Sequence, residues 1–129
     1  MNDQKTILLI EDDQILLRMY TKKFENEGFN VLVATDGEEG LKILEAASPK
    51  PSIILADVML PKMNGFEFLE KCKQNEATKN IPIILLTNLG GGEQDREKGK
   101  SLGAADYLIK SEITPTEIIG KVNKIIENG

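Results

Sequence analysis

The amino-acid sequence predicts an α/β fold, namely a doubly wound sheet of five parallel strands with five helices spread over both faces. Short β-branched or aliphatic runs alternate with longer segments of helical period, which is the pattern of βα units that build a parallel sheet. The first, third and fourth runs are apolar almost throughout, as expected of strands buried on both faces. A chain of 129 residues can bury one core, so residues 1–129 are expected to form one domain.

The strands are expected at the aliphatic runs, which are Thr6 to Ile10, Asn30 to Ala34, Ser52 to Ala56, Ile83 to Thr87 and Asp106 to Ile109. The first two helices have clear signals at their ends. Asp13 is placed to cap a helix that Gly28 ends. Asp36, with Glu39 three residues further on, is expected to form a capping box at the start of the second helix.

The later helices are signalled unequally. An apolar stripe runs from Gly65 to about residue 75, and Thr114, a proline and Glu117 form a capping box before the last helix. Residues 93–102 offer almost no apolar face. Gly99 lies inside this segment and costs about 1 kcal/mol relative to alanine, so the fourth helix is expected to be short or easily frayed.

The composition excludes several function classes. Five more acidic than basic side chains, with a pI near 4.8, argue against direct DNA or RNA binding. The absence of histidine removes imidazole bases and histidine ligands, and a single cysteine, Cys72, allows neither an internal disulfide nor a cysteine-rich zinc site. Apolar runs are far shorter than the roughly 20 residues of a membrane span, and no secretory signal is visible, so a cytoplasmic protein is expected.

Reactive side chains stand at the ends of four of the five expected strands. Glu11 and Asp12 follow the first strand, Asp57 follows the third, Thr87 closes the fourth and Lys110 follows the fifth. Ligand sites in open parallel sheets lie at the carboxyl ends of strands, where the strand order reverses. In the flavodoxin-like order 2-1-3-4-5 this point falls between strands one and three. The three carboxylates are therefore expected to converge there, with the hydroxyl and the ammonium beside them.

These residue types together indicate phosphoryl chemistry. Three carboxylates this close repel one another, so the site should either raise a pKa or recruit a cation. Without histidine or a cysteine cluster the cation should favour oxygen ligands, and Mg²⁺ is the natural candidate. A metal held by carboxylates attracts phosphate oxygens, and a lysine with a hydroxyl suits a phosphoryl group. One carboxylate is then the expected nucleophile, which would form an aspartyl phosphate.

Four stretches of the sequence look like the signatures of one family. They are the apolar strand into residues 11–13, the run Asp-Val-Met-Leu-Pro-Lys-Met-Asn-Gly at 57–65, the strand into Thr87, and Gly-Ala-Ala-Asp-Tyr-Leu-Ile-Lys at 103–110. Together and in this order they resemble the receiver domain of two-component response regulators. The resemblance covers essentially the whole chain and is nearest to the single-domain, chemotaxis-type members.

The resemblance implies a role for each matching residue. The implied roles are phosphoacceptor for Asp57, Mg²⁺ ligand for Glu11, Asp12, Asp57 and the Met59 carbonyl, phosphoryl contact for Thr87, Lys110 and the Asn88 N–H, and conformational switch for Thr87 and Tyr107. A histidine kinase, a phosphotransfer protein or a small phosphodonor would supply the phosphoryl group. The face formed by the fourth helix, the fifth strand and the fifth helix would then change partners.

The resemblance also implies a signalling phosphoacceptor rather than an enzyme, one that promotes only its own phosphorylation and autodephosphorylation. A monomer is expected, with a phosphorylation-linked dimer as the alternative. The sequence names neither the kinase nor the downstream protein. It is also silent on whether the natural protein stands alone or is part of a longer regulator or hybrid kinase.

Three features depart from the usual pattern of the family. Ser111 stands where a proline usually follows the lysine, and because a non-proline cis bond costs about 3 to 4 kcal/mol, we predict a trans Lys110–Ser111 bond and a locally shifted loop. Asn88 replaces a small residue and is expected to narrow the access of the phosphodonor. Met59 and Leu89 are apolar where some relatives are polar, which predicts a hindered water and a longer-lived phosphoryl group.

Three other functions share parts of this pattern. A phosphatase of the haloacid dehalogenase kind would need a second aspartate two residues after the nucleophile, where Met59 stands. A flavodoxin-type cofactor carrier would need a Ser/Thr/Gly phosphate loop after the first strand, where the acidic run 11–13 would repel phosphate. A receiver-like interaction module that works without phosphorylation is the alternative that the sequence leaves open.

Overall fold

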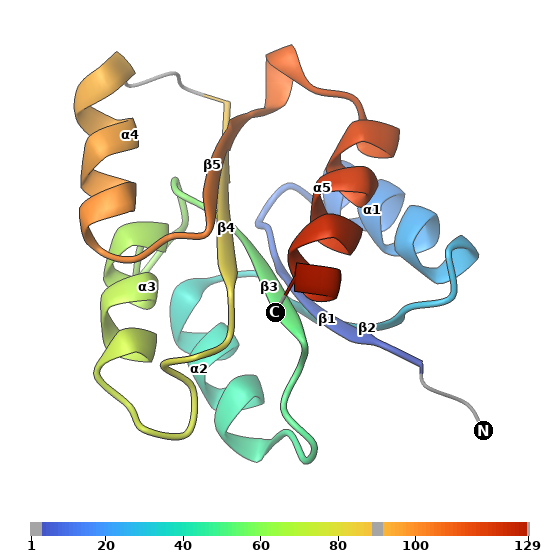
Figure 1. Ribbon diagram of the computed structural model, residues 1–129, viewed down its shortest axis with the longest axis horizontal. Helices are drawn as coiled ribbons and strands as arrows, with labels where there is room; N and C mark the ends of the chain where they lie inside the picture. Colours follow the sequence, from blue (N-terminus) through green and yellow to red (C-terminus); the bar gives the residue numbers. More distant parts are fainter. Residues whose placement is uncertain (1–3, 89–91, 129) are drawn as a thin grey trace.

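The computed structural model describes residues 4–88 and 92–128, and within these ranges it holds five parallel strands in the order β2-β1-β3-β4-β5 (Figure 1). The strands are β1 (Thr6–Ile10), β2 (Asn30–Ala34), β3 (Ile53–Asp57), β4 (Ile83–Thr87) and β5 (Asp106–Ile109). The helices are α1 (Gln14–Asn26), α2 (Gly37–Ala46), α3 (Gly65–Lys73), α4 (Gly92–Ser101), α5 (Pro115–Asn128) and a 3₁₀ turn, η1 (Lys110–Glu112). The predicted fold class and strand order are confirmed.

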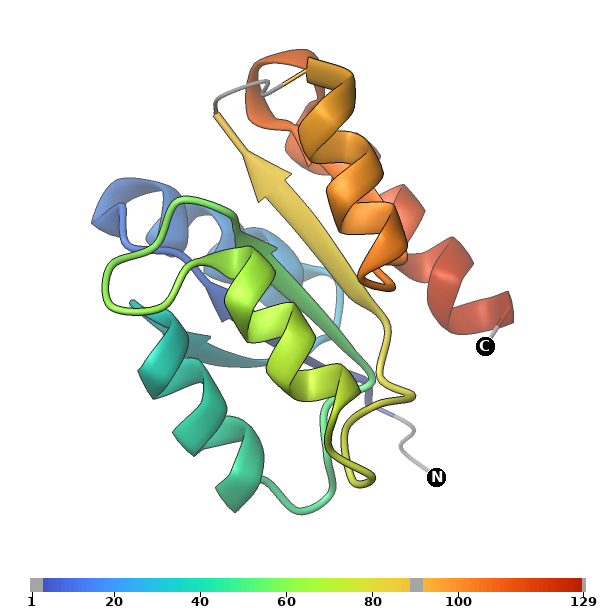
Figure 2. The ribbon, with the colours of Figure 1, turned by 90° about the vertical axis from the view of Figure 1, so that its left-hand side faces the viewer.

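The helices form one layer on each face of the sheet. Helices α1 and α5 cover one face, and α2, α3 and α4 cover the other (Figures 1 and 2). Phe24 and Val122 anchor the apolar cluster under α1 and α5, whereas Leu44 and Phe68 lie in the cluster under α2 and α3. Strands β3 and β4 are buried along their whole length, as predicted. In the part of the chain described, no helix combines the length and apolarity needed to cross a membrane.

Most helix ends follow the signals in the sequence. The Asp13 carboxylate accepts hydrogen bonds from two backbone N–H groups in the first turn of α1, and Gly28 follows the end of α1 with a φ of 92°. Thr114 and Glu117 form both bonds of the predicted capping box at the start of α5, at 2.9 and 3.1 Å. The residues just outside these helices therefore set where they begin and end.

The capping of α2 and α3 differs from the prediction. Asp36 accepts from the N–H of Glu39 at 2.8 Å, but the Glu39 carboxylate accepts from the N–H of Thr35 at 2.6 Å instead of closing the box on Asp36. A complete capping box, which was not predicted from the sequence, joins Asn64 and Glu67 at the start of α3. Helix α3 ends two residues earlier than predicted.

Strand β3 begins and ends one residue later than predicted, so that Asp57 is its last residue rather than the first residue beyond it. Asp57 is paired with Leu86 of β4, and the N–H of Val58 donates to the Leu86 carbonyl at 3.2 Å. The pairing with β4 therefore continues past residue 56 and fixes the backbone of Asp57 within the sheet.

Helix α4 approaches the sheet through Gly99, which is its one buried residue. A Cβ atom at this position would lie 3.1 Å from Leu85 Cδ1 and 3.4 Å from Tyr107 Cδ2. The glycine lowers helix propensity, as the sequence indicates, but it also lets the backbone of α4 lie close to β4 and β5. With 10 residues α4 is as long as α2, so the expectation of a short helix is wrong, whereas the expected fraying stays a prediction.

Candidate functional site

The predicted cluster of reactive side chains forms at the carboxyl end of the sheet. Glu11 directly follows β1, Asp57 ends β3, and Lys110 directly follows β5. Strands β1 and β3 are parallel and in register, with Ile10 opposite Ala56, so the side chains after these positions are brought to the same edge. Glu11 and Asp57 are buried, with 4% and 7% of their surfaces exposed.

The three predicted carboxylates do converge. Glu11, Asp12 and Asp57 each offer one carboxylate oxygen, and these oxygens lie within 4.8 Å of one another. Asp12 is exposed, so the cluster opens to solvent on its side. A set of oxygen donors that carries three negative charges is suited to a hard divalent cation such as Mg²⁺ rather than to a soft metal. The residues present therefore fit the predicted metal.

Lys110 lies between the two buried carboxylates. Its Nζ donates to Glu11 Oε1 at 2.5 Å and to Asp57 Oδ2 at 2.9 Å, and its side chain is only 6% exposed. Burial disfavours the charged ammonium, but the two hydrogen bonds outweigh it, so the pKa of Lys110 is raised. Lys110 is therefore positively charged, and this charge balances part of the negative charge of the carboxylates.

Glu11 has both carboxylate oxygens in hydrogen bonds. Oε1 accepts from Lys110, and Oε2 accepts from the N–H of Asp13 at 3.0 Å. Burial raises the pKa of the Glu11 carboxyl, and the nearby charge of Asp57 raises it further, against the lowering effect of these two hydrogen bonds. The carboxylate of Glu11 is thus fixed in orientation from two sides.

Asp57 is held from both sides as well. Its Oδ1 accepts from the N–H of Met59 at 3.0 Å, whereas its Oδ2 accepts from Lys110. The following loop folds back so closely that the N–H of Gly65 donates to the Val58 carbonyl at 2.9 Å. A Cβ atom at Gly65 would lie only 2.4 Å from the Asp57 carbonyl oxygen. Gly65 therefore permits a tight turn directly behind the carboxylate.

The predicted switch residues share one face of the sheet. Tyr107 is opposite Leu85 and Ile109 is opposite Thr87, so the side chains of all four project to the side covered by α4. Thr87 is 1% exposed and Tyr107 is 4% exposed. Thr87 comes one position after Leu86, the partner of Asp57 in β4, which puts its backbone next to the acidic cluster.

The described residues that depart from the family pattern are exposed to solvent. Asn88 is exposed, and Met59 is 57% exposed, while Leu89 lies outside the described residues. The Lys110–Ser111 bond is trans as predicted, since Ser48–Pro49 is the cis bond found in the described parts of the chain.

Two features of the site were not predicted from the sequence. The topology predicts an ammonium beside the carboxylates, but not that Lys110 bonds to Glu11, a residue 99 positions away. Arg96 of α4 also went unnoticed, although it donates from Nη1 to the Tyr107 carbonyl at 3.0 Å. Arg96 comes three residues before Gly99, and residues three apart share a helix face. This spacing is the one feature of the sequence that could have indicated that Arg96 faces the sheet.

An acidic cluster paired with a lysine, at the carboxyl end of a sheet in this strand order, is the arrangement that the sequence resemblance predicts for a signalling domain. The family described as "Response regulator receiver domain" matches residues 7–123, and the chain belongs to this family. The sequence resemblance is therefore confirmed.

Relatives and solved structures agree with this assignment. The transcriptional regulatory protein CpxR of Escherichia coli (strain K12) is 40% identical over 120 residues, which are 93% of this chain and 48% of CpxR. The alkaline phosphatase synthesis transcriptional regulatory protein PhoP of Bacillus subtilis (strain 168) is 37% identical over 122 residues, or 95% of this chain and 48% of PhoP. The chain thus spans about half the length of these curated relatives.

Among solved structures, a putative response regulator from Chloroflexus aurantiacus J-10-fl is 30% identical, with a TM-score of 0.87 over 97% of this chain and 99% of the other. A CheY-like receiver domain protein from Methanospirillum hungatei JF-1 is 26% identical, with a TM-score of 0.88 over 98% of this chain and 96% of the other.

Proposed function

We propose that Asp57 accepts a phosphoryl group in a two-component His-to-Asp relay, and that residues 1–129 work as one receiver domain. The observation that carries this proposal is the convergence of the Glu11, Asp12 and Asp57 oxygens within 4.8 Å, with Lys110 Nζ 2.9 Å from Asp57. The donor would be a sensor histidine kinase, a phosphotransfer protein or a small phosphodonor. The chain has no histidine, so an imidazole donor must come from a partner.

In the proposed reaction an oxygen of the Asp57 carboxylate attacks the phosphorus, and the bond from phosphorus to the donor breaks. The N–H of Met59 and the ammonium of Lys110 orient the carboxylate, because each is bonded to a different oxygen. Lys110, the Thr87 hydroxyl and the N–H of Asn88 then contact the transferred phosphoryl group. These positioned donors are suited to the extra negative charge of the product.

Mg²⁺ would be held by Glu11, Asp12, Asp57 and the carbonyl of Met59, and when bound it would offset the negative charge of the carboxylates and the phosphoryl oxygens. The fit of the site supports this assignment. Because both oxygens of Glu11 already accept hydrogen bonds, Glu11 would act on the metal through a remaining lone pair or a water, while exposed Asp12 can bind it directly.

The phosphorylated state would be read by a protein partner on the face formed by α4, β5 and α5. The phosphoryl group would draw Thr87 toward it, and Tyr107 would stay buried. This face has two conformational states, and phosphorylation would change how many molecules are in each. The chain itself is proposed to act in the cytoplasm as a monomer without binding nucleic acid, and a phosphorylation-linked dimer is the alternative. Its own activity would be limited to its phosphorylation and autodephosphorylation.

Asp57→Asn is expected to abolish phosphorylation. Wild-type protein incubated with acetyl phosphate and Mg²⁺ should gain the mass of one phosphoryl group, and beryllofluoride with Mg²⁺ should shift its NMR signals. The amide of asparagine is not a comparable nucleophile, so the variant should show neither change. Intact mass spectrometry and NMR measure both effects. No response in the wild type would favour a phosphorylation-independent interaction module, and an undiminished response in Asp57→Asn would exclude Asp57 as the acceptor.

Met59→Asn is expected to shorten the lifetime of the phosphoryl group. Met59 is two residues beyond Asp57 and 57% exposed, so its side chain is placed at the solvent side of the acceptor. A polar side chain there can orient an attacking water by a hydrogen bond that the thioether does not make, and a hydrogen bond worth about 1.4 kcal/mol in the transition state corresponds to about tenfold in rate. Loss of phosphate from purified phosphoprotein measures it, and an unchanged rate would contradict the prediction.

A further inference from the structure

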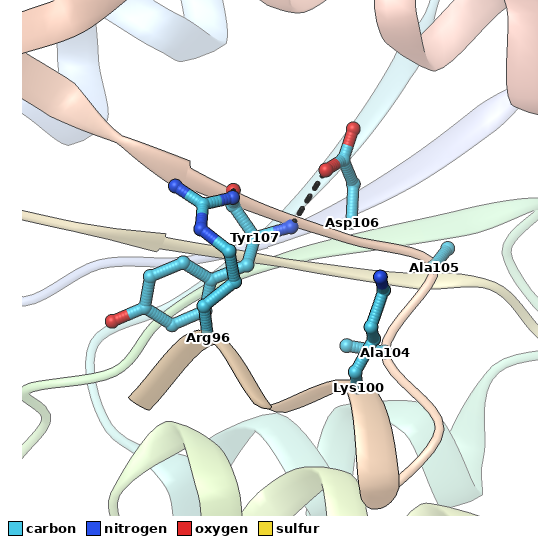
Figure 3. Close-up of a pocket in the computed structure, with 6 residues that line it drawn as sticks. All are labelled: Arg96, Lys100, Ala104, Ala105, Asp106 and Tyr107. Atoms are coloured by element: carbon cyan, nitrogen blue, oxygen red, sulfur yellow. Dashed lines mark hydrogen bonds between the residues drawn. The ribbon is translucent and has the colours of Figure 1, made fainter. Parts of the chain in front are cut away.

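Arg96 of α4 contacts the predicted switch residue Tyr107 in two ways (Figure 3). Its Nη1 donates to the Tyr107 carbonyl oxygen at 3.0 Å, and its Cζ lies 5.3 Å from the centre of the Tyr107 ring. Nε of Arg96 is also 4.0 Å from a carboxylate oxygen of Glu93 in the preceding turn, and the side chain is 39% exposed. One guanidinium therefore reaches both the backbone and the ring of the same residue.

Both backbone groups of Tyr107 are bonded to side chains. The N–H donates to Asp106 Oδ1 at 2.8 Å, while the carbonyl accepts from Arg96. Asp106 in turn lies 3.6 Å from Nζ of Lys121 on α5. Residue 107 is on β5, the edge strand of the sheet that the described residues form. Side chains of α4 and α5 thus converge on the backbone around this residue.

The Tyr107 ring is enclosed on the same side. Gly99 lies one turn after Arg96 on α4, and a Cβ there would approach the Tyr107 ring to 3.4 Å and Leu85 to 3.1 Å. Leu85 is two residues before Thr87 and shares its face of the sheet. The ring therefore lies between the backbone of α4 and the strand that leads to the proposed phosphoryl site.

We propose that Arg96 is a positioning residue that holds Tyr107 in its buried orientation, and so couples α4 to the state of Asp57. The inference rests on the proposed function, in which Tyr107 is the switch aromatic. A guanidinium suits this role because its planar fork can donate to a carbonyl while it lies against a ring, whereas an ammonium is a point charge. Without Arg96, a smaller fraction of the unphosphorylated molecules would have the Tyr107 ring buried and α4 in the position seen here.

The orientation of Tyr107 can be tested without any phosphoryl group. The chain has two tyrosines, Tyr20 and Tyr107, so 3-fluorotyrosine gives two ¹⁹F signals that Tyr107→Phe assigns. Both residues are buried, at 6% and 4% exposure. In Arg96→Ala the relaxation of the Tyr107 signal by a soluble paramagnetic agent should rise several-fold, while the Tyr20 signal stays unchanged. An unchanged Tyr107 signal in the folded variant would overturn the proposal.

Coupling to Asp57 is tested by titrating the same proteins with beryllofluoride and Mg²⁺. If only a tenth of the Arg96→Ala molecules hold the buried ring, apparent affinity should fall about tenfold, because a ligand binds in proportion to the competent fraction. Lys98→Ala is the matched control, since Lys98 is on the same helix but its cation lies against a different ring, with Nζ 4.6 Å from the centre of Phe66. It should leave both readouts unchanged, and an equal effect there would overturn the proposal.

Arg96→Lys is a second variant for the case in which Arg96→Ala fails to fold. It keeps the charge but loses the planar fork, so its two readouts should lie between those of the wild type and of Arg96→Ala. If Arg96→Lys gave the wild-type result in both measurements, the positive charge alone would explain the role of Arg96. That result would contradict the proposal that the guanidinium positions the Tyr107 ring and carbonyl together. If wild-type protein does not respond to beryllofluoride, the proposed function fails, whereas the ¹⁹F measurement still reports on Arg96.

Discussion

Lys110→Met is expected to lower the free energy of unfolding at pH 7 by about 3 kcal/mol, because removal of one partner from a buried ion pair leaves the opposite charge uncompensated. Here two carboxylates would be left, since Lys110 bridges Glu11 and Asp57, whose side chains are 5% and 8% exposed. Methionine preserves most of the aliphatic stem, so the loss reports charge more than packing. Urea unfolding with linear extrapolation measures it.

This loss should shrink as the pH falls. Burial raises the pKa of Glu11 in the folded protein above its ordinary value of 4.5. The protonated Glu11 therefore stabilises the fold fully at pH values below 4.5, and this contribution is lost as the pH rises through the raised pKa. The ammonium of Lys110 lowers that pKa, so its removal should move the transition to higher pH. The raised pKa of Lys110 itself stabilises the fold at all pH values below 10.5. The variant should therefore lie closer to the wild type at pH 5 than at pH 7.

The control for this experiment is Lys79→Met. Lys79 Nζ is 3.0 Å from Glu76, but the two side chains are 42% and 88% exposed, and such surface pairs contribute at most about 1 kcal/mol. Addition of Mg²⁺ should restore part of the stability of Lys110→Met, because a cation at the carboxylates replaces some of the missing charge. Wild-type stability of Lys110→Met at pH 7 would show that the bridge contributes nothing.

Local chemistry was readable from the sequence wherever a single element carries it. The caps at Asp13 and Thr114 are set by side chains within three residues of the bonds they make, and both were predicted. The convergence of Glu11 and Asp57 was also predictable, because parallel strands bring their carboxyl ends to one edge whatever their separation in sequence. In these cases a known periodicity or topology determines the geometry.

The remaining details depend on how two elements pack, which no single pattern encodes. Gly99 lowers the helix propensity of α4 when that helix is considered alone. Its contribution to packing becomes clear only when α4 is placed against Leu85 and Tyr107, which leave little room for a Cβ atom. Arg96 is one charge among many in a polar segment until α4 is placed on β5. The one-residue shift of β3 has the same origin, since the pairing of Asp57 with Leu86 depends on the neighbouring strand.

Gly65→Ala is expected to destabilise the protein by about 2 kcal/mol, within the range for overpacking of a tight site, although alanine is the better helix former. A Cβ at Gly65 would lie 2.4 Å from the Asp57 carbonyl oxygen and 2.8 Å from Val58 Cα. Both are backbone atoms, so no rotamer change can relieve the clash. Gly120→Ala on α5 is the matched control, because among the described residues no atom from outside its own stretch of helix lies within 4 Å of its added Cβ. That variant should gain about 0.5 to 1 kcal/mol.

The same pair of variants separates a stability effect from an effect on the site. The displaced atoms in Gly65→Ala belong to Asp57 and its neighbour, and the N–H of Gly65 is bonded to Val58, so relief of the clash must move the proposed phosphoacceptor. Phosphorylation by acetyl phosphate, measured at a low temperature where both variants are folded, should therefore slow at least tenfold in Gly65→Ala, since a misplacement of about 1 Å can cost 10²-fold in rate. Gly120→Ala should react as the wild type does. Equal rates in the two variants would mean that the turn behind Asp57 adjusts without moving its carboxylate.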